Sequence, residues 1–209
     1  MADYIQIHPK NPQARQLARV VARLHDGAVI AYPTDSSYAL GCHMGDKAAT
    51  ERIRRIREFG RQHQFTLMCR DLSEVSTFTK LDNSAFRLLK SLTPGPYTFI
   101  LPAMHAVPRR ALHERRKTIG VRIPDHATVL ALLRALGEPI MSCTLIVPGD
   151  ELPLSEPEQV YDALANEVDV IVDSGVCGLE PTTVLDLTGG TPRLMRRGKG
   201  DVSRLVLDT

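Results

Sequence analysis

The sequence lacks the features that mark several large classes of protein. It has no apolar run of 18 residues and no signal-peptide pattern, so neither a membrane span nor secretion is expected. Its four cysteines, Cys42, Cys69, Cys143 and Cys177, form no Cys-x-x-Cys pair, and its seven histidines show no metal-ligand spacing. We therefore expect a cytoplasmic protein whose cysteines are small buried hydrophobes or free thiols, with no tightly bound metal.

A strong charge imbalance and a high aromatic content are also missing. The 209 residues carry a formal net charge of +2, so affinity for nucleic acid does not follow from the total charge. Aromatic residues make up 5% of the chain, which argues against extensive stacking on single-stranded bases. The sequence shows no Ser-His-Asp triad, Walker loop or G-x-G-x-x-G fingerprint. Any binding site must therefore follow from how charged and hydroxyl side chains are distributed.

What is present is the composition of an ordinary globular protein, with 43% apolar and 24% charged residues. Helical and strand patterns alternate along the chain, which indicates an α/β sheet covered by helices. Because there is no internal repeat or linker, residues 1–209 are expected to form one domain. Helices are expected over 12–26, 47–58, 84–92, 128–136 and 157–166. Strands are expected over 28–32, 65–69, 97–101, 118–123, 140–147, 168–173, 183–187 and 193–195.

The most informative segment follows the apolar run over 28–31. Pro33 lacks the N–H that a central strand needs, so the strand is expected to end there. Residues 34–38 (Thr-Asp-Ser-Ser-Tyr) should then lie on a loop outside the core, where their hydroxyls and carboxylate suit a polar small molecule. Gly41 would allow close backbone approach. The alternative is a capped turn, since Thr, Asp and Ser are common turn residues.

Arg122 differs from the other basic residues because it lies within the apolar strand expected over 118–123. An unpaired charge there would be costly, so its guanidinium needs an anionic partner. Two explanations stay open: an ion pair with an acidic residue elsewhere, or a site that binds an anion. Thr144 and the hydroxyl-rich tract 180–188 form a second polar group that could face residues 34–38.

Three further basic groups are candidates for contacts with anions. Taken singly, such a group is more often a solvated helix face or loop than a binding site. They are Arg52, Arg54, Arg55, Arg57 and Arg61; Arg109, Arg110, Arg115, Arg116 and Lys117; and Arg196, Arg197 and Lys199.

Several segments, taken in order, resemble the YrdC/YciO family, and its YciO branch in particular. They are Tyr32-Pro-Thr-Asp with Leu40-Gly41, the Arg57 region, Thr93-Pro-Gly-Pro-Tyr-Thr, Thr118-Ile-Gly-Val-Arg-Ile-Pro, Thr182-Thr-Val with Asp186, and Arg196 with Gly198. The resemblance implies a single YrdC-like α/β domain over 1–209, with a twisted mixed sheet covered by helices and a positively charged concave surface. It also implies binding of nucleotides and double-stranded RNA.

Catalytic members of that family join L-threonine, bicarbonate and ATP, with Mg²⁺, into threonylcarbamoyl-adenylate and pyrophosphate, for modification of tRNA adenosine. By position, the resemblance assigns catalysis to Arg57 and Thr144, and substrate binding to Thr34, Arg122 and Thr182. It assigns binding of ATP or AMP to Arg57, Arg61 and Arg196. For RNA, whether double-stranded RNA, tRNA or rRNA, we expect contacts from Arg52, Arg55, Arg109, Arg110, Arg115, Arg116 and Lys117.

The chain departs from the catalytic pattern at two motifs, because the Lys-x-Arg and Ser-x-Asn of catalytic members correspond here to residues 57–59 and 144–146. Arg57 keeps a charge and Thr144 a hydroxyl, whereas Phe59 and Ile146 donate no side-chain hydrogen bond. Two lost contacts to charged groups would cost about 3–6 kcal/mol, or on the order of 10²–10⁴ in rate. We therefore predict a YciO-like nucleotide- and RNA-binding protein with weak or altered synthase activity. The alternatives are a competent synthase and a noncatalytic RNA-binding module.

Overall fold

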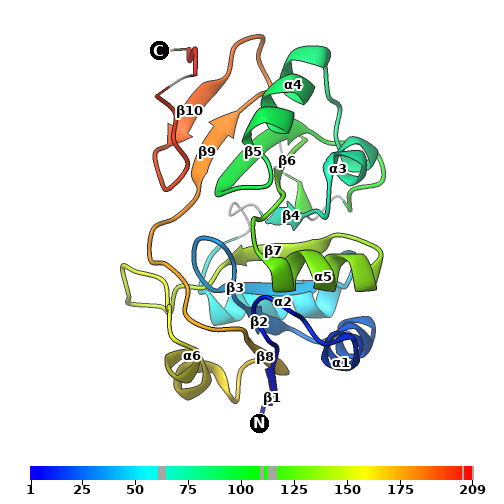
Figure 1. Ribbon diagram of the computed structural model, residues 1–209, viewed down its shortest axis with the longest axis vertical. Coiled ribbons are helices and arrows are strands. Elements are labelled where there is room, and N and C mark those ends of the chain that lie inside the picture. Colours follow the sequence, from blue (N-terminus) through cyan, green and yellow to red (C-terminus); the bar gives the residue numbers. More distant parts are fainter. Residues whose placement is uncertain (61–64, 109–110, 113–116, 204, 209) are drawn as a thin grey trace.

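The computed structural model describes residues 1–60, 65–108, 111–112, 117–203 and 205–208, and its central element is one ten-stranded sheet (Figure 1). The strand order is β1-β8-β2-β3-β7-β4-β6-β5-β9-β10, with parallel and antiparallel neighbours mixed. The strands are β1 (Asp3–Gln6), β2 (Ile30–Tyr32), β3 (Ala39–His43), β4 (Thr66–Met68), β5 (Tyr97–Pro102), β6 (Thr118–Arg122), β7 (Ile140–Thr144), β8 (Val170–Asp173), β9 (Thr183–Asp186) and β10 (Arg193–Arg196). The predicted mixed α/β fold is confirmed.

In the described parts of the chain, six helices pack on this sheet: α1 (Ala14–His25), α2 (Lys47–Ile56), α3 (Leu72–Phe78), α4 (Asn83–Leu92), α5 (Ala127–Leu136) and α6 (Pro157–Leu164). Side chains alternate between two cores because successive residues of a strand point to opposite faces. Ile30 and Tyr32 pack in one core with α1 and α5, which lie side by side, whereas Ala31 belongs to a second core with α2, α3, α4 and α6 (Figure 1). No helix in the described parts of the chain is long and apolar enough to cross a membrane.

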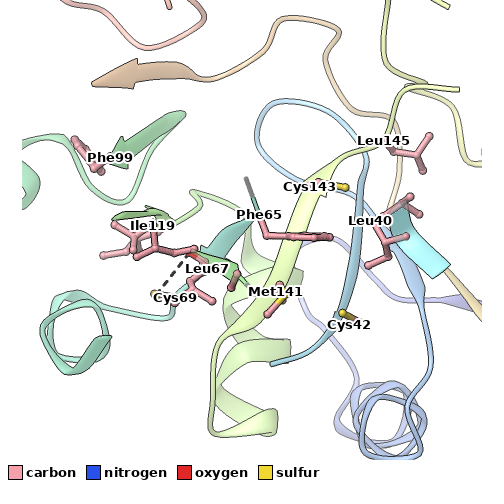
Figure 2. Close-up of a cluster of buried hydrophobic side chains, with 14 of the residues drawn as sticks. Leu40, Cys42, Phe65, Leu67, Cys69, Phe99, Ile119, Met141, Cys143 and Leu145 are labelled. Atoms are coloured by element: carbon pink, nitrogen blue, oxygen red, sulfur yellow. Dashed lines mark hydrogen bonds between the residues drawn. The ribbon is translucent and has the colours of Figure 1, made fainter. Parts of the chain in front are cut away.

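The second core contains three of the four cysteines. Figure 2 shows Cys42 and Cys143 near Phe65, and Cys69 donating to the Leu67 carbonyl, 3.7 Å away. Burial raises the pKa of the Cys143 thiol to about 12. Cys177 is partly exposed, and burial still raises its pKa to about 11. Cys42, Cys69 and Cys143 are therefore small buried residues, which is one of the two predicted alternatives, and none of the four cysteines forms a disulfide with another described residue.

Three elements were not predicted from the sequence. The strand β1 pairs parallel with β8 at one edge of the sheet. The strand β3 pairs antiparallel with β2 and β7 and buries Leu40 and Cys42. The helix α3 begins at the N-cap Asp71, whose carboxylate accepts a hydrogen bond of 2.8 Å from the Glu74 N–H. It has seven residues, too few for a clear helical period in the sequence.

Candidate functional site

A cavity of about 480 Å³ lies on one face of the sheet, a volume typical of small-molecule sites. Its floor consists of alternate residues from neighbouring strands, because positions i and i+2 of a strand share a face. Thr66 of β4 pairs with Ser142 of β7 and with Gly120 of β6, and all three residues line the cavity. Five residues to which the family resemblance assigns catalysis or the binding of substrate or nucleotide also line it: Arg57, Arg122, Thr144, Thr182 and Arg196. Thr34 lies next to this set and outside the lining.

Arg122, at the end of β6, forms a buried ion pair with Asp35 of the loop that follows β2. The two side chains are 8% and 9% exposed. The second carboxylate oxygen of Asp35 accepts a hydrogen bond of 3.1 Å from the Asp125 N–H. Arg122 also lines the cavity, and its Nε is buried without a hydrogen-bond partner among the described residues. The geometry therefore fits both explanations for Arg122. Its guanidinium pairs with the Asp35 carboxylate, and it also lines a cavity large enough for an anion.

The expectation that residues 34–38 lie outside the core is wrong for most of them. Thr34 is 3% exposed, and Ser36, Ser37 and Tyr38 are also buried. The Thr34 hydroxyl closes the turn locally, because it donates to the Ser37 carbonyl at 2.6 Å and accepts from the Ser36 N–H at 3.2 Å. It lies 3.3 Å from Nη2 of Arg122. The segment is thus a buried, hydrogen-bonded turn, and two of its residues, Ser37 and Tyr38, line the cavity.

Gly41 does allow a close approach, and the atoms that approach it belong to other residues of the protein. A Cβ at this position would lie 2.7 Å from side-chain atoms of Ile140 and Tyr32. The glycine therefore permits tight packing of β3 against β2 and β7.

Arg57 is the C-cap residue of α2. It brings residues 57–59 into contact with residues 144–146, the two motifs at which the chain departs from the catalytic pattern. Its Nη1 donates to the backbone carbonyl of Ile146, and its guanidinium lies 5.8 Å from the centre of the Phe59 ring. Phe59 also packs edge-on against Phe65, at 5.8 Å between ring centres. Arg57, Thr144 and Ile146 line the cavity, whereas Phe59 is absent from the described lining.

The opposite wall is formed by the C-terminal strands. Arg196 of β10 donates to the Thr182 carbonyl at 3.0 Å and to its hydroxyl at 3.1 Å. The Thr182 hydroxyl is 2.9 Å from that of Thr98. Desolvation of the part of the guanidinium that is covered, and then the charge of Arg122, lower the pKa of Arg196, although an arginine stays protonated at neutral pH.

Three of the seven residues predicted to bind RNA lie in the described chain. Arg52 is engaged in an ion pair of 2.7 Å with Asp169 and also donates to the Glu167 carbonyl. Arg55 and Lys117 are exposed. The remaining four, Arg109, Arg110, Arg115 and Arg116, lie outside the described residues, as does Arg61, which was predicted to bind nucleotide.

Sequence reasoning missed the residues that line the cavity from long connections. Glu151, Leu152 and Pro153 come from the loop between β7 and α6, and Leu179 from the loop before β9. Lys199 was noted as part of a basic group, but its role was not predicted: its Nζ donates to the Asp35 carbonyl at 2.7 Å. None of these residues stands in a recognisable motif, so only the tertiary structure identifies them.

Three arginines and several threonine hydroxyls around one cavity define a candidate binding site for an anionic small molecule on an α/β sheet. The chain belongs to the Sua5/YciO/YrdC family, because that family's model, described as telomere recombination, matches residues 22–198. The family resemblance seen in the sequence is therefore confirmed.

The chain is similar to proteins from both branches of the family. It is 54% identical over 202 residues to the uncharacterized protein YciO of Escherichia coli K12, covering 97% of this chain and 98% of that protein. It is 32% identical over 183 residues to the threonylcarbamoyl-AMP synthase of Chromobacterium violaceum, covering 87% of this chain and 94% of the synthase. The crystal structure of E. coli YciO superposes with a TM-score of 0.95 at 53% identity, covering 99% of this chain and 100% of that chain.

The buried ion pair provides a first prediction. Asp35→Asn should lower the free energy of unfolding by about 3–5 kcal/mol, because it leaves the Arg122 charge buried without its carboxylate. Adding Arg122→Met should recover part of this loss, since the double variant has no uncompensated charge. Urea unfolding of the wild type, both single variants and the double variant measures the interaction.

The exposed pair of Asp3 and Arg23 is a matched control, with side chains 50% and 43% exposed. The same substitutions there should change stability by less than about 1 kcal/mol. Strictly additive effects at Asp35 and Arg122 would contradict the predicted role of their ion pair.

Proposed function

We propose that the cavity binds a nucleoside triphosphate and supports adenylate formation weakly, or with an altered substrate, as in a YciO-like relative of the threonylcarbamoyl-AMP synthases. The observation that carries this proposal is the placement of Arg57, Arg122 and Arg196 around one cavity. Guanidinium groups are suited to phosphate and carboxylate oxygens because they offer several donors in one plane. The 32% identity to a named synthase supplies the reaction class.

In this reaction, an oxygen of the carbamate formed from L-threonine and bicarbonate would attack the α-phosphorus of ATP. The bond from the α-phosphorus to the bridging oxygen would break, and pyrophosphate would leave. Arg57 and Arg196 would neutralise charge on the phosphates, and Arg122 would hold an anionic group of the amino-acid substrate. Mg²⁺ would stabilise the departing pyrophosphate.

The residues present fit an ion that arrives with the nucleotide. Glu151 is the single carboxylate among the described lining residues, so the protein offers few ligands of its own. Mg²⁺ commonly binds through one or two carboxylates together with substrate phosphates and water.

Residues 57–59 and 144–146, where the chain departs from the catalytic pattern, favour weak synthase activity over that of a competent synthase. The Phe59 ring packs against Phe65 and supplies no donor, and the Ile146 side chain is apolar. One donor of Arg57 is already engaged by the Ile146 carbonyl. The cavity therefore keeps charge that can attract a triphosphate while it lacks donors that catalytic members supply.

Binding of ATP tests the first part of the proposal. Arg196→Met should weaken ATP binding roughly 10- to 100-fold, since a hydrogen bond to a charged group contributes about 1.5–3 kcal/mol. Isothermal titration calorimetry with Mg-ATP measures the affinity. Arg197→Met is the matched control, because it removes the same charge from the next residue, which is absent from the described lining. Equal affinities for the two variants would refute a nucleotide site at Arg196.

Pyrophosphate release tests the second part. We expect slow release from ATP that increases with L-threonine and bicarbonate. Arg57→Lys, Phe59→Arg, Thr144→Ser and Ile146→Asn together should raise it by ~10-fold or more, which corresponds to roughly 1.4 kcal/mol of barrier. Direct detection of threonylcarbamoyl-adenylate should rise in parallel.

The pairs Arg57→Lys with Phe59→Arg, and Thr144→Ser with Ile146→Asn, serve as controls and should each give less than the quadruple variant. Thermal melting must first show that each variant is folded, because Phe59→Arg removes an apolar contact. A folded quadruple variant without a gain in rate would exclude the two motifs as the cause of weak chemistry. A wild-type rate comparable to that of a threonylcarbamoyl-AMP synthase would instead identify a competent enzyme.

We also propose that the chain binds double-stranded RNA. The exposed Arg55 of α2 and the exposed Lys117 favour this, because cationic side chains at the surface can contact RNA phosphates. Arg52 is the weaker candidate, since its guanidinium is held by Asp169 and the Glu167 carbonyl.

Affinity for a short RNA duplex should fall steeply between low and physiological salt, because phosphate contacts release counterions. Arg55→Ala should weaken binding and reduce the salt slope by about 1. Arg134→Ala, which removes an exposed arginine from α5, is the control and should leave the slope unchanged. Fluorescence anisotropy at several salt concentrations measures both. Binding no tighter than that of a neutral protein would reject RNA as a ligand and favour the small-molecule site alone.

A further inference from the structure

We propose that His25, His43 and Glu138 form a binding site for a divalent transition-metal ion such as Zn²⁺, separate from the cavity. Their candidate ligand atoms, two imidazole nitrogens and a carboxylate oxygen, all lie within 4.8 Å of one another. Nε2 of His43 is 2.6 Å from Oε1 of Glu138, and the rings of His25 and His43 are 5.7 Å apart between centres. None of the three residues lines the cavity.

The three ligands come from the ends of three different elements. His25 is the last residue of α1, and His43 is the last residue of β3. Glu138 follows Gly137, whose left-handed conformation (φ 79°) ends α5 and turns the chain back toward β7. The expectation that no metal is tightly bound rested on local spacing, and these residues are too far apart in sequence for any spacing rule to connect them.

The donor set matches the chemistry of the proposed ion. Two imidazoles and one carboxylate hold zinc in a well-known class of site that keeps a fourth position open for water. Imidazole suits Zn²⁺, Ni²⁺ and Cu²⁺, whereas the carboxylate- and water-preferring Mg²⁺ and Ca²⁺ are poor matches. A simple ion pair explains His43 with Glu138, but one carboxylate compensates only one imidazolium. A dication instead engages both neutral rings and the carboxylate together.

The distances and exposure allow the ion to enter. Ligands at about 2.0–2.2 Å from zinc in a tetrahedron lie roughly 3.5 Å apart. Separations of at most 4.8 Å must therefore close by no more than about 1.3 Å, and the 2.6 Å contact of His43 with Glu138 must open by about 0.9 Å. Side-chain rotation can supply this, since His25 is exposed and the side chains of His43 and Glu138 are 31% and 28% exposed. The site would therefore fill from solvent without unfolding.

The position of the site gives it a structural role. β3 and β7 pair from Ala39 with Thr144 at the cavity to His43 with Ile140 at the opposite end. A metal ion at His43 would tie that far end to α1 and to the turn after α5. The bound ion should thus stabilise the fold without touching a ligand in the cavity.

Metal binding to the full chain, stripped with chelator, tests the proposal. Titration of Zn²⁺ against a chromophoric competitor should show one ion per chain. Co²⁺ should give the visible absorption of a tetrahedral site. His25→Ala, His43→Ala and Glu138→Gln should each weaken Zn²⁺ binding by at least ~10-fold. His105→Ala, which removes an exposed histidine elsewhere, should change nothing.

Thermal melting gives an independent readout. Saturating Zn²⁺ should raise the melting temperature of the wild type and of His105→Ala, because an ion that binds only the folded state stabilises it. The increase should vanish in Glu138→Gln. This variant keeps the shape of the side chain, so it still tests the site if a histidine variant fails to fold. Weak binding that is equal in all variants, or tight binding that survives each ligand substitution, would overturn the site.

Discussion

The ion pair of Arg122 with Asp35 is the interaction on which the candidate site depends, because it joins separate segments at the cavity wall. Asp35 receives Arg122 from β6 and the N–H of Asp125 from the approach to α5. Its backbone carbonyl receives Lys199 from the C-terminal tract. A buried charge pair costs desolvation free energy, which its geometry and additional hydrogen bonds must offset. These contacts offset part of that cost and hold the turn of Thr34 against Arg122, although Nε of Arg122 has no hydrogen-bond partner among the described residues. The same ion pair therefore also shapes the cavity wall.

The far wall has a different physical basis, in which close backbone packing replaces charge. At Gly198, a Cβ would lie 2.2 Å from the Pro181 carbonyl oxygen, so only glycine lets the C-terminal tract pass this closely. The Gly198 N–H donates to the Thr183 hydroxyl at 3.1 Å, which in turn donates to the Gly200 carbonyl at 2.7 Å. This packing holds Arg196 against Thr182. Arg122 is thus positioned by an ion pair, and Arg196 by the close passage of the backbone at Gly198 near the edge of the sheet.

The sequence predicts those parts of the structure that depend on local pattern. The α/β class, most strands, and the need of Arg122 for a partner follow from periodicity and from the cost of a buried charge. The partner itself does not, because Asp35 and Arg122 are 87 residues apart. Nor does the burial of Thr34, whose hydroxyl reads as a solvated turn group until the surrounding strands cover it. Glu151 and Leu152 reach the cavity on an irregular loop, and His25 meets His43 only through the packing of α1 on β3. Contacts of this kind arise from topology, which carries no local signal.

The contacts of Arg57 account for how the proposed ATP affinity and the proposed rate of adenylate formation can depend on different groups in one cavity. Its guanidinium lies between the two departing positions, with the Phe59 ring 5.8 Å from it and the Ile146 carbonyl accepting its hydrogen bond. A substitution of Phe59 removes the ring contact, whereas the contact with position 146 comes from the backbone and does not depend on the side chain there. A fixed positive charge attracts the ground-state triphosphate, whereas rate requires donors that strengthen as pyrophosphate leaves. If the cavity binds ATP as proposed, Arg57 would therefore contribute to affinity more than to rate. A chain with 54% identity to YciO and 32% to a synthase thus combines an arginine-lined cavity with the apolar side chains of Phe59 and Ile146 beside Arg57.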